Sequence, residues 1–190
     1  MSILILGIII FGGIHLWSML LPQSRDTLKA RLGEGPYKGL YSLVSAIGII
    51  LVVWGFIRAR NDGSGADLIY EPALWTRHAA MLLVLLAFIF VGASHGKGYL
   101  KRWLRQPMSV GIGLWAVAHL LANGQLTDVV LFVAILIIAV LDIILSTARG
   151  KIPRHVPQIR SDIIAVVVGV ILYAIFLFGF HPYILGVPIV

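Results

Sequence analysis

The stretch TDVVLFVAILIIAVLDIILST, residues 127–147, is an apolar run long enough to cross a bilayer, because a spanning helix needs about 20 residues. Five more apolar segments occur along the chain, at residues 2–21, 38–57, 73–94, 108–123 and 162–185. Hydrocarbon offers the backbone no hydrogen-bonding partner, so an open chain crosses it only as helices. The sequence therefore predicts an all-α polytopic membrane protein, a bundle of six transmembrane helices in a single domain over residues 1–190.

The composition excludes most soluble classes. Of the 190 residues, 59% are hydrophobic and 12% are charged, and the mean hydropathy is +0.98. A soluble domain carries about 25% charged residues, so an ordinary soluble enzyme, a disordered chain and a nucleic-acid-binding domain are all excluded. Membrane lipid is the expected partner, and nucleic acid is not. With no cysteine, the chain has no disulfide, iron–sulfur cluster, thiolate haem ligand or covalent c-type haem.

The distribution of charge predicts the orientation in the membrane. The net charge is +7, and the cations gather in the first, third and fifth loops. The third loop holds four cations and no acid: Lys97, Lys101, Arg102 and Arg105. Basic loops stay in the cytoplasm, so we expect both termini on the periplasmic side of a bacterial inner membrane. We also expect the first segment to be a retained helix rather than a signal peptide, because no basic region precedes it.

Ionisable residues within the apolar segments are candidates for function, because burying them in a membrane is costly. They are His15, His78, His119, His181 and Asp142. Zinc and non-haem iron sites usually include carboxylates, whereas imidazoles alone suit haem b. The alternative for each histidine is a hydrogen bond to a neighbouring helix. For Asp142 the alternatives are an ion pair or interfacial carboxylate and a proton relay.

The depths of the histidines leave several ligand pairs open. With the predicted orientation, His15 and His119 differ in depth by roughly 10 Å at 1.5 Å per residue. His78 and His181 lie toward the same side as His119, so an outer pair drawn from these three competes, and two haems are a further alternative. His181 precedes Pro182, and a residue before proline leaves the α region, so it is also a candidate helix terminator.

The stretch LWAVAHLLANG, residues 114–124, resembles the signature of the NnrU family of membrane proteins. The similarity extends to Gly13-Ile14-His15 with Arg25 after it, to YKGLY at residues 37–41, to Arg77-His78, and to HPYILGVP at residues 181–188. Together these motifs cover nearly the whole chain. The tryptophan–histidine–asparagine stretch is the most specific of them.

The resemblance implies a haem b protein. The family joins bacterial proteins linked to denitrification and nitric oxide reduction with the plant 15-cis-zeta-carotene isomerase, whose haem ligands correspond to His15 and His119 here. Trp115 and Asn123 share a helix row with His119 at four-residue spacing and are expected to line the cofactor. Apart from the resemblance, Arg25 and Arg31 are candidates to pair with haem propionates that point to the cytoplasm, and the alternative for both is a role in positive-inside topology alone. His78 and His181 are the alternate iron ligands.

Two departures bear on the activity that the resemblance implies. Ala116 stands where the plant branch carries a cysteine, and Gln106 stands where relatives often carry a histidine. The sequence therefore favours a redox, sensing or regulatory role linked to denitrification or nitric oxide metabolism, with a redox partner. The alternative is a haem-dependent isomerase acting on an apolar polyene. Weaker alternatives are a membrane methyltransferase and a structural subunit, and enzymatic activity stays open.

Overall fold

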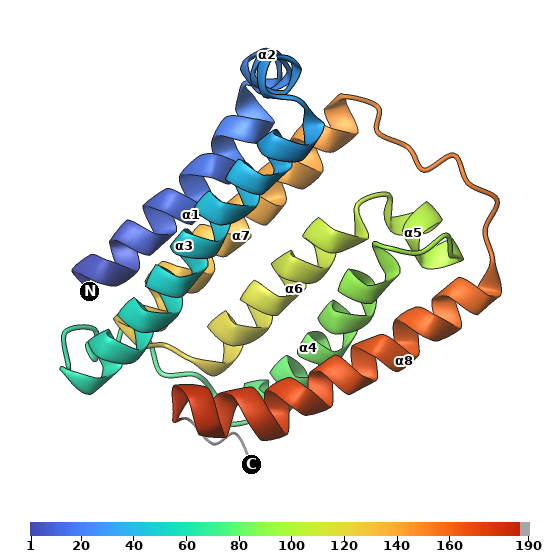
Figure 1. Cartoon of the computed structure of the whole chain (residues 1–190). Helices are drawn as coiled ribbons and strands as arrows, with labels where there is room; N and C mark the ends of the chain where they lie inside the picture. Colours follow the sequence, from blue (N-terminus) through green and yellow to red (C-terminus); the bar gives the residue numbers. More distant parts are fainter. Residues whose placement is uncertain (187–190) are drawn as a thin grey trace. The chain divides into compact units, whose positions relative to one another are not determined.

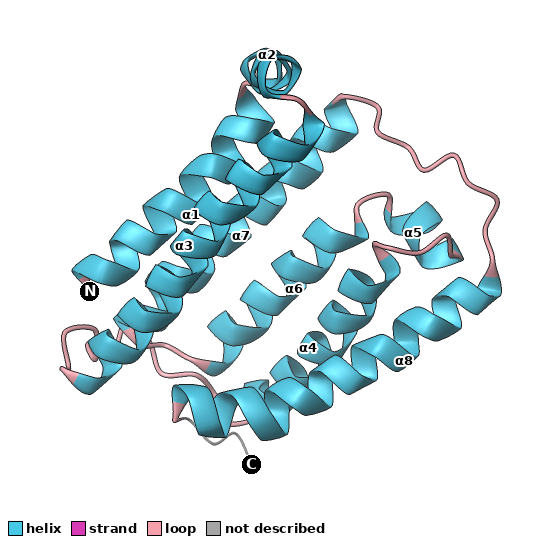
Figure 2. Cartoon of the chain, in the orientation of Figure 1, coloured by secondary structure: helices cyan, strands magenta, loops and turns pink. Residues whose placement is uncertain are grey.

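The computed structural model of the chain describes residues 1–186, in which nine helical segments follow one another (Figure 1). Figure 2 shows that loops alone connect them. Within the described range the only strand-like pairing is one bridge between Leu68 and Gln125. Val187 and Pro188, the last residues of the family-like ending, lie outside the described residues. The prediction of an all-α chain is confirmed.

The six predicted segments correspond to six helices. Five are long and apolar enough to cross a membrane: α1 (Ser2–Leu20), α3 (Glu34–Asn61), α4 (Thr76–Ala93), α7 (Leu126–Ala148) and the continuous segment Ile159–Leu185. The sixth, α6 (Pro107–Ala122), is apolar but shorter, and proline at its first position is favoured because no N–H is needed there. The chain is thus a multi-pass membrane protein, and its orientation stays a prediction.

Two helices lie outside the predicted segments. The first is α2 (Pro22–Leu32), whose sequence PQSRDTLKARL is largely polar, and the second is α5 (Tyr99–Leu104), which has only six residues. Neither produces an apolar run of spanning length, so hydropathy does not reveal them. Both were therefore predicted as loop and are corrected here to helix.

Most apolar side chains point away from the protein. In each of the five long helices, no more than 22% of the apolar window is buried inside the protein. Side chains such as Ile9 and Ile50 are more than 60% exposed. In water such surfaces would drive aggregation, whereas in a bilayer the acyl chains cover them.

The described contacts divide the chain into two compact units. Unit one comprises residues 1–70 and 125–134, and unit two comprises residues 71–124 and the described residues from 135 onward. Helix α7 contributes its first part to unit one and the rest to unit two. The single domain over residues 1–190 stays a prediction.

Unit one is built on the close approach of α1 and α3 (Figure 1). A Cβ atom added to Gly55 of α3 would lie 2.3 Å from the backbone nitrogen of Leu4, so only glycine permits this contact. The second loop is tied to the start of α7, where the buried Thr127 hydroxyl donates to the carbonyl oxygen of Gly65 at 2.9 Å. Arg60 and Asp128 form an ion pair at 3.5 Å beside it.

Unit two is built around α4, which packs against α6 and against α8 (Ile159–Ile175). A carboxylate of α8 holds the start of α5, because Asp162 accepts hydrogen bonds from the backbone N–H groups of Tyr99 at 2.8 Å and Leu100 at 3.2 Å. The His155 ring donates from Nε2 to the carbonyl oxygen of Gly98 at 3.0 Å. The third and fifth loops therefore pack together, although both are basic.

The sixth predicted helix has an unexpected second half. Helix α8 continues without a break into a π-helix, η1 (Phe176–Leu185), which contains Pro182. Proline has no N–H, and its ring displaces the preceding turn, so a widened turn accommodates it. His181 therefore does not terminate the helix, because η1 continues to Leu185 before Gly186 adopts a left-handed conformation with φ of 66°.

Candidate functional site

The candidate site of unit two begins with His119 in the last turn of α6. The Nδ1 atom of His119 lies 2.8 Å from the carbonyl oxygen of Trp115, one turn earlier. The Trp115 and His119 rings lie 4.8 Å apart, and the Asn123 amide donates to the carbonyl oxygen of His119 at 3.0 Å. The three residues thus form a hydrogen-bonded row along α6, as their four-residue spacing indicates.

The structure brings a second histidine to His119. The centres of the His119 and His181 rings are 6.1 Å apart, and the two ring planes are inclined by 18°. His181 lies in η1, and its Nδ1 atom is 2.8 Å from the carbonyl oxygen of Phe176, five residues earlier. That five-residue step is the hydrogen-bond spacing of a π-helix, which often occurs at functional sites.

His15 repeats the same arrangement in unit one. On α1 its Nδ1 atom lies 2.7 Å from the carbonyl oxygen of Phe11. The His15 ring is half-buried against the rings of Phe11 and Tyr41, at 4.2 Å and 5.5 Å between centres. Tyr41 belongs to the YKGLY stretch at residues 37–41, whose four-residue tyrosine spacing was the only sequence signal for this contact.

The carbonyl contacts define the tautomer of these rings. A carbonyl oxygen only accepts hydrogen bonds, so the Nδ1 atoms of His15, His119 and His181 each carry the proton and donate it. In the neutral ring the Nε2 atom then carries a lone pair. A histidine that ligates a metal usually has this arrangement, because a backbone carbonyl that accepts from one ring nitrogen orients the other toward the metal.

The donor set matches haem better than a bare metal ion. Among residues 1–186 no group of three or more histidine, cysteine, aspartate or glutamate side chains is close enough to hold a metal ion. Two imidazoles alone leave a bare ion short of ligands, whereas the porphyrin supplies four nitrogens to iron and needs only axial partners. The His119 and His181 rings are stacked and nearly parallel, with centres 6.1 Å apart, and this distance alone does not direct their Nε2 atoms at one iron.

The remaining predicted site residues lie elsewhere. His78 is exposed in the first turn of α4. Arg25 lies in α2, where its guanidinium pairs with the neighbouring Asp26 at 2.8 Å. His15 belongs to unit one and His119 to unit two, so the pairing of these two ligands stays a prediction.

The intramembrane carboxylate Asp142 is separate from the histidines. It lies on α7 and accepts hydrogen bonds from the hydroxyls of Ser109 on α6 and Ser146 on its own helix. The contact with Ser109 joins α6 to the second part of α7 within unit two. A hydroxyl partner on a neighbouring helix satisfies a carboxylate that lipid cannot solvate.

Comparison with known proteins gives one finding. A family model described as NnrU protein matches residues 3–189, nearly the whole chain. No curated protein and no solved structure matches the chain.

Proposed function

The chain belongs to the NnrU family, and from this membership we propose that it is an integral membrane haem b protein with a redox, sensing or regulatory role linked to denitrification or nitric oxide metabolism. The proposal places the cofactor between imidazoles inside the helices. Membrane lipid surrounds the protein, and a redox partner exchanges electrons with it.

One observation carries the proposal. Three histidines within the apolar helices, His15, His119 and His181, each donate Nδ1–H to a carbonyl of their own helix, the tautomer that a ligand histidine has. A histidine that merely joined two helices would direct its ring nitrogens to a neighbouring helix. All three rings donate to a carbonyl of their own helix in a very apolar chain, and metal ligation through Nε2 explains this repeated arrangement better.

His119 is the ligand common to both candidate pairs. The family resemblance implies His15 as its partner, and the ring separation of 6.1 Å supports His181. Trp115 and Asn123 hold the turn that carries His119. When bound, a haem with two imidazole ligands supplies one-electron exchange between ferric and ferrous iron.

The residue beside this site favours electron exchange over the isomerase alternative. Ala116 lies on α6 and is fully buried, at the position where the plant branch has cysteine. A methyl group supplies no thiolate, so an exchange of thiolate for imidazole at iron does not occur in this chain. Two histidines of this chain would hold the cofactor without an open position for a substrate, which would suit electron transfer.

The visible spectrum and iron content of the purified protein test the proposal. We expect sharp low-spin haem b bands in the natural chain and loss of haem or of the low-spin signal in His119→Ala. The matched control is His95→Ala, which removes an exposed loop histidine. A folded His119→Ala protein with an unchanged spectrum would contradict the assignment.

Two further variants identify the second ligand. Loss of the low-spin signal in His15→Ala, with His181→Ala unchanged, supports the pair that the resemblance implies. The opposite result supports the pair brought together in unit two. Reduced protein is then offered nitric oxide and, separately, 15-cis-zeta-carotene. Conversion of the carotene without a spectral response to nitric oxide would favour the isomerase.

A further inference from the structure

A shallow hollow of about 400 Å³ lies at the end of α3, far along the chain from the histidines of unit two. Five residues line it: Trp54, Ile57, Arg58, Asn61 and Asp62. Four of them belong to the last two turns of α3, and Asp62 is the residue that ends the helix. The hollow therefore lies where an apolar, membrane-crossing helix meets the second loop.

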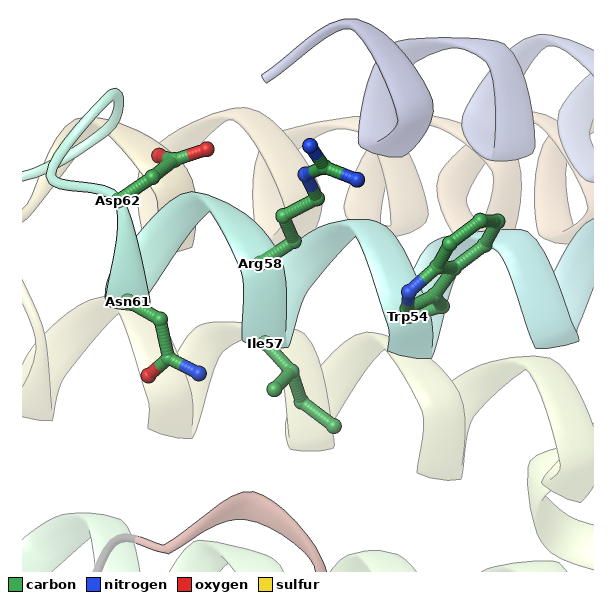
Figure 3. A pocket seen from close by; sticks show the side chains of 5 residues that line it. All are labelled: Trp54, Ile57, Arg58, Asn61 and Asp62. Carbon is green, nitrogen blue, oxygen red and sulfur yellow. The ribbon is translucent and has the colours of Figure 1, made fainter.

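Three of the lining residues form a row along the helix. Trp54, Arg58 and Asp62 are spaced four residues apart. In Figure 3 Arg58 and Asp62 rise above α3, Ile57 and Asn61 extend below it, and the Trp54 indole rises from its lower edge. Each step along the row is about 6 Å at 1.5 Å per residue. The row places an aromatic ring, a cation and an anion in order along the helix axis.

This order has a direction relative to the membrane. The residues before Trp54, from Ile47 to Val53, are apolar or glycine, whereas Asn61 ends the helix and Asp62 begins a loop rich in glycine and polar residues. Tryptophan concentrates at the level of the lipid headgroups, and arginine near a helix end extends toward water. From hydrocarbon to water the sequence of groups is therefore indole, guanidinium and carboxylate.

The charged groups in the row lie at the surface, where they also act on one another. The side chains of Trp54, Arg58 and Asp62 are exposed, and among residues 1–186 Arg58 forms no ion pair. Asp62 accepts a hydrogen bond from the backbone N–H of Ser64 at 2.9 Å, the Ser64 side chain bonds to it as well, and the charges of the N-terminal ammonium and of Arg58 also act on it. Hydrogen bonds from Ser64 lower the pKa of Asp62, so the carboxylate is charged at neutral pH.

We propose that this hollow binds the headgroup of a phospholipid that carries both a phosphate and a primary ammonium, as phosphatidylethanolamine does. Arg58 binds the phosphate, because guanidinium groups match phosphate oxygens with paired donors. Asp62 accepts N–H bonds from the ammonium, and Trp54 packs against the glycerol and the first part of the acyl chains. The order of chemical groups along α3 is the order of groups along this lipid.

Two other common headgroups match the row less well. A phosphatidylglycerol headgroup has no cation, so its binding leaves the Asp62 carboxylate beside an anion. The quaternary ammonium of phosphatidylcholine carries no N–H and donates no hydrogen bond to Asp62. We therefore expect the site to prefer lipids with a primary ammonium, and this preference depends on Asp62. Its affinity for the phosphate depends on Arg58.

Native mass spectrometry of the purified full chain tests the proposal. The protein is exchanged into detergent with equal amounts of phosphatidylethanolamine and phosphatidylcholine of the same acyl chains. We expect more bound phosphatidylethanolamine in the natural chain. Arg58→Gln should retain about two- to fivefold less of this lipid, the effect of one exposed ion pair. Arg154→Gln, which removes an exposed cation of the fifth loop, should match the natural chain.

Two additional measurements separate the lipid site from a general attraction of charge. Asp62→Asn keeps an oxygen for the Ser64 N–H but removes the charge, and we expect it to abolish the preference between the two lipids. Soluble phosphoethanolamine should compete only weakly, because it has no acyl chains for Trp54. Three results would each overturn the proposal. The first is equal retention of both lipids by the natural chain, the second is an equal loss of lipid in Arg58→Gln and Arg154→Gln, and the third is full competition by phosphoethanolamine.

Discussion

Replacing Gly111 with alanine tests whether the contact between α6 and α4 positions the candidate ligand His119. A Cβ atom at Gly111 would lie 2.7 Å from the carbonyl oxygen of Ala87 and 3.1 Å from the backbone nitrogen of Val91. The first distance is about 0.7 Å short of an ordinary contact. Both neighbours are backbone atoms of α4, so the whole helix must move.

The matched control lies two residues further along the same helix. A Cβ atom at Gly113 would lie 3.7 Å from the Ala139 methyl group, an ordinary contact. Both substitutions gain about 0.5–1 kcal/mol from replacing glycine inside a helix, so this gain cancels between the two variants. The difference that remains is overpacking, about 1–3 kcal/mol. Gly111→Ala should therefore unfold about 5- to 150-fold more readily than Gly113→Ala.

Reversible unfolding in mixed micelles measures this difference. The natural chain and both variants are titrated with sodium dodecyl sulfate, and the loss of helix is followed by far-ultraviolet circular dichroism. We expect the midpoint of Gly111→Ala to fall below that of Gly113→Ala. Under the proposed function Gly111→Ala also retains less haem, because the displaced α6 carries His119 with it. Equal midpoints, or a lower midpoint for Gly113→Ala, would show that backbone contact does not fix α6.

Three other predictions concern hydrogen bonds at the helix ends. Asp162→Ala removes the acceptor of two N–H groups at the start of α5 and should lower the free energy of unfolding by about 1.5–3 kcal/mol; hydrogen exchange at those amides should rise, and unchanged exchange would contradict the cap. Thr127→Val should cost about 1 kcal/mol because the carbonyl of Gly65 loses its hydroxyl donor, whereas Thr127→Ser, measured by the same titration, should cost less. The pKa of Asp62, followed by NMR, should lie below 3.8; because the folded state then binds its proton less readily, this contribution to stability is present at neutral pH and is lost as the pH falls through the folded pKa. A pKa at or above 3.8 would contradict the bond from Ser64.

The sequence predicted the long helices because a membrane-crossing helix coincides with its apolar run. The predicted ends of the helices were less accurate. The predicted segment at residues 38–57 is part of the longer helix α3, which runs over Glu34–Asn61. Polar residues continue this helix at both ends, and hydropathy gives no signal for them. The largely polar α2 and the six-residue α5 were missed for the same reason.

The candidate site was predictable only in part. Trp115, His119 and Asn123 form one row because four-residue spacing is a property of any α-helix. The approach of His181 to His119 depends on how α6 and α8 pack against α4 and on the change to a π-helix after Ile175. Nothing in the order of residues gives that ring distance, although counting residues placed both histidines toward one side of the membrane.

In η1 the number of residues between Phe176 and His181 determines which carbonyl the His181 ring can reach. In an α-helix each residue turns the chain by about 100°, so His181 would bond to the residue four positions earlier and project in another direction. The wider turn instead links His181 to Phe176, as if one residue had been inserted. Gly179, whose Cβ position has no neighbour within 4 Å, lies between them. Deleting that one glycine would place His181 four residues after Phe176, the step at which His15 and His119 reach a carbonyl of their own α-helix, so the ring would keep its carbonyl partner while the wide turn is lost.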